Sequence, residues 1–222
     1  MSDPGTPSAT DSLRGPAVGV FVFLLALATY ANTFSARYAW DDVSSFLFHE
    51  HVQDSSKFFQ LFVEDQHAFG RGQGNFYRPL LSVTFMIDYA IAAPSTINPD
   101  EPAPLIFHFS SALWHALAAL GLFALLARLG ALPIVCLVVP AIFAVHPLHT
   151  EAVAYVSGRA DSMSAAFMFW GLTLALSMSV GRRRWAAVAG SILCFVAAML
   201  SKESSAIYPV LLLVCLWITS GP

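Results

Sequence analysis

Six apolar runs separated by polar turns leave this chain few ways to fold. They cover residues 16–34, 105–127, 132–145, 161–180, 185–200 and 204–219. About 20 apolar residues are needed for a helix to cross a bilayer, and most of these runs approach that length. The chain is 57% hydrophobic and only 11% charged, whereas soluble domains are about a quarter charged. The sequence therefore predicts an all-α, polytopic transmembrane bundle of about six spans, residues 16–222.

The segment between the first two runs, residues 35–104, is predicted to be a large first outer loop. Its mixed aromatic and charged residues predict short helices that lie on the membrane surface. The apolar stretch 80–93 is short for a span and contains Asp88, so we expect an interfacial or re-entrant helix there. Residues 1–15 are rich in Ser, Thr, Pro and Gly, which predicts a disordered cytoplasmic tail. A cleaved signal peptide is the alternative interpretation of 16–34.

The arginines predict which side of the membrane each turn faces. Arg128 and the triplet at 182–184 lie in turns that contain no acidic residue, and positive charge in short loops stays cytoplasmic. With six spans, the N-terminus and both of these turns are therefore inside. A crossing at 80–93 would reverse every later turn and expose the triplet outside, so the charge pattern rejects that crossing.

The opposite ends of the runs carry a cluster of ionisable residues. Such groups at bilayer depth are costly and usually functional. The candidates are Asp41, Asp42, Arg78, His108, His146, His149, Glu151, Arg159, Asp161, Lys202 and Glu203. The structural alternative is that Asp161 pairs with Arg159 or caps a helix, that Glu203 pairs with Lys202, and that His108 and His115 belong to a packing seam of small residues.

The mixture of acids and cations predicts group transfer involving a phosphate. A carboxylate of the first loop can act as a general base on a hydroxyl, while Arg78, Arg159 or Lys202 can hold a phosphate through charge-assisted hydrogen bonds. A metal site is not expected, because the His-x-x-His pair at 146 and 149 lacks an identified third ligand.

Several short motifs occur in a characteristic order along the chain. They are Trp40-Asp41-Asp42, Tyr77-Arg78-Pro79-Leu80, Phe107-His108, the block from Ala144 through His146-Pro147-Leu148-His149-Thr150-Glu151 to Val153, Gly158-Arg159-Ala160-Asp161, and Leu200-Ser201-Lys202-Glu203. Together they resemble the transmembrane O-mannosyltransferases that carry tetratricopeptide repeats, in the GT-C class of glycosyltransferases. The resemblance extends from about residue 20 to residue 215.

The resemblance implies transfer of mannose, or a related sugar, from a polyprenyl- or dolichyl-phosphate donor to Ser or Thr hydroxyls of a protein, outside the cytoplasm and with inversion. Asp41 matches the presumed base and Asp42 the second acid of the family's pair, and the sequence leaves open which of the two carboxylates is the base. Lys202 matches a lysine that contacts donor phosphate, and Arg78 and Arg159 are further phosphate candidates. The expected partners are the lipid-linked donor, a protein acceptor and membrane lipids, with no nucleic acid. No cofactor and no divalent metal are expected.

The sequence also departs from that family. The class has more spans, and no tetratricopeptide array follows residue 219, so we expect a C-terminally truncated fragment that is inactive alone. A non-catalytic polytopic protein, such as a transporter or a degenerate scaffold, is the alternative. A transporter is expected to show internal repeats and broken helices that meet near the bilayer midplane. Of the two membranes considered, the bacterial inner membrane is favoured over the endoplasmic reticulum.

Overall fold

A computed structural model describes residues 13, 15–66, 76–92, 94–95, 101–177 and 182–220, without the side chains of Val43, Arg182 and Arg183. Apart from Leu13 and Gly15, the tail predicted to be disordered lies outside the described residues. Within them the regular structure is helical, as predicted, and the single β-bridge joins Pro94 to Pro102.

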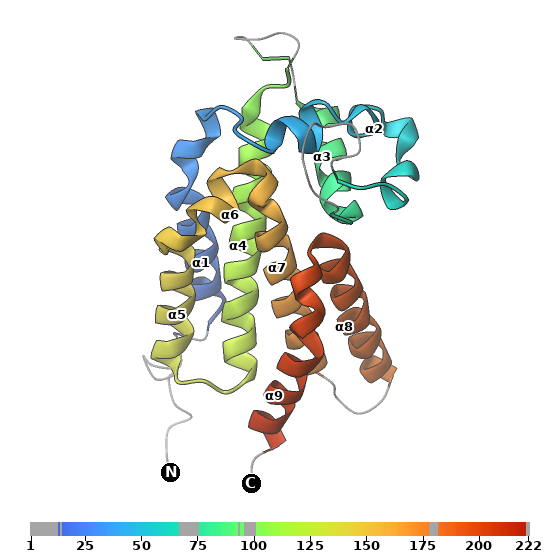
Figure 1. Cartoon of the computed structure of the whole chain (residues 1–222). Coiled ribbons are helices and arrows are strands. Elements are labelled where there is room, and N and C mark those ends of the chain that lie inside the picture. Colours follow the sequence, from blue (N-terminus) through green and yellow to red (C-terminus); the bar gives the residue numbers. More distant parts are fainter. Residues whose placement is uncertain are drawn as a thin grey trace, which may run out of the picture.

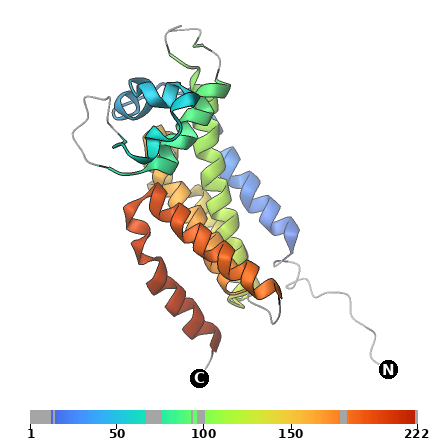
Figure 2. The same ribbon diagram turned by 90° about the vertical axis from the view of Figure 1, so that its right-hand side faces the viewer.

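The main body is a bundle of long helices that run between the same two ends of the molecule (Figures 1 and 2). Its members are α1 (Pro16–Thr29), α4 (Pro104–Arg128), α5 (Pro133–Val145), α7 (Arg159–Ala175), α8 (Arg182–Ser201) and α9 (Tyr208–Ser220). The first three begin with proline, whose missing N–H costs nothing in the first turn of a helix. Figure 1 shows the start of α1 and the end of α9 toward the end of the bundle opposite α2 and α3.

Small residues bring the bundle helices close together. Ala116 and Ala119 of α4 are fully buried against Val22 and Ala26 of α1. Close packing of this kind replaces the hydrophobic effect as the force that holds helices together in lipid. His115 lies in the same seam, where its Nε2 is 3.2 Å from the carbonyl oxygen of Ala144. The seam predicted from the sequence is therefore present.

Four helical segments are long and apolar enough to cross a membrane, namely 16–35, 104–128, 184–201 and 203–220. A fifth candidate combines α5 with residues 147–154, across a bend of 47°. The predicted span 161–180 corresponds to α7, which does not meet this criterion. Its first turn contains Arg159 and Asp161, and residues 178–180 lie outside the described ranges. The described part of the chain is thus a polytopic bundle with four or five candidate spans, fewer than the six expected.

The first loop folds into a cap over one end of the bundle (Figure 1). It contains η3 (Val43–Leu47), α2 (Glu50–Gln53), η4 (Ser55–Lys57), η5 (Gln60–Phe62) and α3 (Pro79–Ile91), and η2 (Ala31–Ser35) precedes it at the end of the first candidate span. Phe46 of the cap stacks on Phe107 of α4, with 4.7 Å between ring centroids, and contacts Phe85 of α3. The stretch predicted not to cross corresponds to α3, which has 13 residues and is not among the candidate spans.

Candidate active site

The segment between α5 and α7 lies under the cap and folds tightly on itself. It consists of η6 (Pro147–His149), α6 (Thr150–Ala154) and η7 (Val156–Gly158). A Cβ atom on Gly158 would lie 2.3 Å from the backbone oxygen of Glu151. Because that contact is with backbone, no side-chain movement relieves it. Glycine is therefore required at position 158, and it fixes where Glu151 sits relative to the start of α7.

Asp42 ties the cap to this segment. Its Oδ1 accepts hydrogen bonds of 2.8 Å from both the backbone N–H and the hydroxyl of Ser157, and its Oδ2 accepts one from the N–H of Ala39. The side chain is buried. Burial raises the pKa of the Asp42 carboxyl, and these hydrogen bonds oppose that shift. With both oxygens occupied, Asp42 has a structural role that the sequence did not reveal.

Asp41, by contrast, is exposed and borders a hollow of about 180 Å³, which we call the central hollow. Residues from the cap, from the start of α3 and from the 151–161 segment line it, including Gln66, Phe76, Arg78, Glu151, Tyr155 and Asp161. The backbone N–H of Asp41 donates to the Tyr155 hydroxyl at 3.0 Å. Burial, Asp41 and Asp42 raise the pKa of the Tyr155 phenol, so this hydroxyl keeps a proton that it can donate.

At this end of the bundle, Arg78 and Lys202 are each paired with a carboxylate. Arg78 donates from Nε and Nη2 to the two carboxylate oxygens of Glu203, at 3.1 and 2.8 Å. Lys202 Nζ pairs with Asp161 Oδ1. Glu203 and Asp161 are more than half exposed, and pairs of this kind contribute little to stability. An anion can therefore displace either carboxylate at low cost.

Arg159 is placed differently from the other predicted phosphate ligands. Its side chain is completely buried, and its Nη1 lies 2.6 Å from Asp88 Oδ2 of α3. Its remaining donors reach the hydroxyls of Ser111 and Thr84 and the carbonyl of Phe107. The structure thus does not bring Arg159 to the central hollow. Sequence reasoning missed its partner because the apolar stretch around Asp88 suggested an interfacial or re-entrant helix and gave no sign of which residue Asp88 would contact.

A second hollow of about 470 Å³, the bundle hollow, adjoins the first and shares Glu151 and Asp161 with it. Its apolar wall includes Phe143, Leu148 and Met168, and serines of α7 supply polar groups. His149 lines it and packs on Phe143, with 4.4 Å between ring centroids. The bundle hollow therefore offers an apolar surface next to the charged groups.

The remaining predicted histidines lie away from the central hollow. His146 caps η6 by accepting from the N–H of Leu148 at 3.3 Å. His108 is buried and stacks on Tyr38. No group of three or more His, Cys, Asp or Glu side chains in the described ranges is placed to hold a metal ion, and a reaction without metal remains a prediction.

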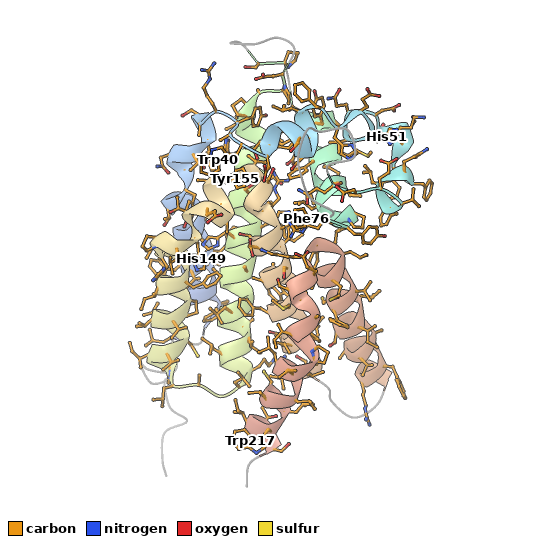
Figure 3. The ribbon with its side chains drawn as sticks, viewed as in Figure 1. Trp40, His51, Phe76, His149, Tyr155 and Trp217 are labelled. Carbon is orange, nitrogen blue, oxygen red and sulfur yellow. The ribbon has the colours of Figure 1, made fainter. Side chains whose placement is uncertain are left out.

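Tyr155, Phe76 and Gln66 line the central hollow, and sequence reasoning missed all three. Figure 3 shows Tyr155 beside Trp40, with Phe76 near the start of α3. Tyr155 lies only two residues beyond the motif that ends at Val153, and this closeness was the one sequence signal that could have identified it as a site residue. Gln66 and Phe76 belong to the loop, where no periodic pattern indicates which side chains point inward.

Comparison with known proteins identifies the relatives of this chain. Human "Protein O-mannosyl-transferase TMTC2" is 31% identical over 193 residues, which is 81% of this chain. The chain is a relative of the protein O-mannosyl-transferases. Mouse "Protein O-mannosyl-transferase TMTC3" is 29% identical over 79% of the chain, and Drosophila melanogaster "Protein O-mannosyl-transferase Tmtc2" is 29% identical over 84%. This confirms the family resemblance found in the motifs.

The chain spans about a fifth of the length of these protein O-mannosyl-transferases, between 19% and 21%. No protein-family model matches it, and no solved structure matches it.

Proposed function

We propose that this chain forms a transfer site at which mannose passes from a lipid-phosphate donor to a Ser or Thr hydroxyl of a protein. The observation that carries the proposal is the central hollow, where the exposed carboxylate of Asp41 and the guanidinium of Arg78 share one cavity. Such a transfer needs a base for the incoming hydroxyl and cations for the leaving phosphate. The names of the relatives support mannose as the sugar and protein as the acceptor.

In the proposed reaction, the acceptor oxygen attacks the anomeric carbon of the sugar while Asp41 removes the hydroxyl proton. The bond between the sugar and the phosphate breaks, and its electron pair leaves with the phosphate. One displacement of this kind inverts the anomeric centre. Asp41 suits the role of base better than Asp42 does, because both carboxylate oxygens of Asp42 already accept hydrogen bonds.

The donor phosphate is proposed to bind Lys202 and Arg78 by displacing Asp161 and Glu203. The apolar wall of the bundle hollow then receives the first part of the lipid. Arg159 has no part in binding the phosphate, because it is buried and paired with Asp88.

A transfer assay with the purified full-length protein in vesicles and dolichyl- or polyprenyl-phosphate-mannose tests this function. Lys202→Ala should raise the donor KM about tenfold or more, because it removes a charge-assisted contact to the phosphate. The acceptor KM should stay the same. Lys57→Ala, in the cap, is the matched control and should change neither value. An unchanged donor KM in Lys202→Ala would exclude Lys202 as a phosphate ligand, and no transfer by the wild type would reject the function.

We also propose that the cap faces away from the cytoplasm and that the N-terminus lies inside. A single cysteine at Arg184, in a background without Cys136, Cys194 and Cys215, should resist an impermeant maleimide added to intact cells. A cysteine at Phe59, which is 80% exposed in the cap, should react. The reverse labelling pattern would overturn this orientation. The relatives named above are animal proteins and do not support the predicted preference for a bacterial membrane.

A further inference from the structure

Trp40 is an unusual residue beside the proposed base. Its side chain is 80% exposed, and its backbone has a φ of 49°. A residue other than glycine in this region carries strain, which proteins tend to keep at functional positions. The indole packs edge-on against Tyr155, with 5.7 Å between ring centroids (Figure 3). The fold therefore holds a large aromatic surface open next to Asp41.

These two rings border a third hollow, of about 450 Å³, which we call the aromatic hollow. Ala39, Trp40, Thr150, Glu151, Ala154 and Tyr155 line it. It shares Glu151 and Tyr155 with the central hollow, so a molecule bound in it lies beside Asp41. Apart from Glu151 it shares no lining residue with the bundle hollow, which is proposed for the donor lipid.

The charge around the aromatic hollow is negative. Glu151 is exposed, lines all three hollows and forms no ion pair with any residue that the structure describes. Asp41, on the central side, likewise lacks a cationic partner among those residues. The cations Arg78 and Lys202 are each paired with other carboxylates. A ligand that complements this hollow therefore carries positive charge.

We infer that the aromatic hollow is an acceptor subsite that binds a Lys or Arg side chain close to the Ser or Thr that receives the sugar. This rests on the proposed function. Indole and phenol faces attract ammonium and guanidinium groups, and their apolar surface covers the aliphatic stem of such a side chain. Glu151 supplies the opposite charge. An aliphatic side chain would contact the two rings but leave the Glu151 carboxylate without a partner.

The test compares three acceptor peptides that differ only in the residue next to the acceptor Ser, which is Lys, norleucine or Glu. Each peptide is measured in transfer by the protein in vesicles and in direct binding by fluorescence anisotropy without donor. The wild type should bind the Lys peptide about tenfold more tightly than the norleucine peptide, because an exposed ion pair and a cation–π contact together contribute about that much. It should bind the Glu peptide most weakly. Glu151→Lys should reverse the order between the Lys and Glu peptides.

Trp40→Ala should weaken binding of the Lys peptide more than binding of the norleucine peptide, whereas Trp217→Ala, at the far end of the bundle, should change neither. Equal binding of all three peptides by wild type would overturn the inference. So would a Trp40→Ala protein that keeps the full preference for the Lys peptide, since Trp40 would then have no part in binding the acceptor. A Lys preference in binding without any transfer would support the subsite and reject the proposed function.

Discussion

Asp41→Asn is expected to abolish sugar transfer while leaving the protein folded. The asparagine amide cannot take a proton from the acceptor hydroxyl, and a positioned general base contributes about 10²–10⁴-fold to a rate. The fold should tolerate the change, because Asp41 is exposed and its backbone N–H still donates to Tyr155. Asparagine also keeps a side-chain oxygen that can accept from the Tyr155 hydroxyl, as the Asp41 carboxylate does. We expect kcat to fall by about that factor, with the donor KM unchanged.

The neighbouring acid provides the matched control. Asp42→Asn places an amide nitrogen against the N–H of Ala39 or the N–H of Ser157, both of which are donors. It should therefore lower the melting temperature, and its activity should fall only as far as the folded fraction does. If Asp42→Asn lost all activity while remaining folded, and Asp41→Asn turned over normally, the roles proposed for the two acids would have to be exchanged.

Arg159→Met should strongly destabilise the protein where α7 of the bundle meets α3 of the cap. It leaves the carboxylate of Asp88 buried without its cation, and breaking a buried ion pair from one side typically costs about 3–5 kcal/mol. It also removes donors to Ser111, Thr84 and Phe107. Thermal unfolding in detergent should show a large fall in Tm, whereas Arg184→Met, at an exposed position, should have almost no effect.

The double variant Arg159→Met with Asp88→Leu separates a structural role from a catalytic one. Replacing both charges with apolar side chains should restore most of the lost stability, because no uncompensated charge remains buried. Transfer activity should recover together with the folded fraction. A double variant that is stable but unable to use the lipid-phosphate donor would show that Arg159 binds phosphate after all.

The bundle could be predicted from the sequence because apolar length and the placement of arginines are local signals. These signals identified the helices and put Asp41, Lys202 and Glu203 at the opposite end of the predicted spans from the arginine triplet. The pairing of charges could not be predicted, because it depends on contacts between distant elements. Sequence neighbours suggested Asp161 with Arg159 and Glu203 with Lys202, whereas the structure pairs Asp161 with Lys202, Glu203 with Arg78, and Arg159 with Asp88.

The same limit applies to the two adjacent acids. Asp41 and Asp42 are chemically equivalent in the sequence, and only the fold distinguishes them by burying one against Ser157 and exposing the other. The aromatic hollow was also beyond prediction, since Trp40 and Tyr155 are separated by more than a hundred positions. The order of the motifs along the sequence located the candidate site. The roles proposed for its individual residues depend on tertiary contacts that only the structure shows.

The ion pair between Arg159 and Asp88 also bears on how substrates reach the site. It fastens α3 of the cap to α7 of the bundle, so lifting the cap would separate two charges in apolar surroundings. At a cost of about 4 kcal/mol, only about one molecule in a thousand would be open at any moment. Exchange of substrates by way of the three hollows avoids this cost. The proposed donor and acceptor can then enter the site by separate routes, without the whole cap moving in each cycle.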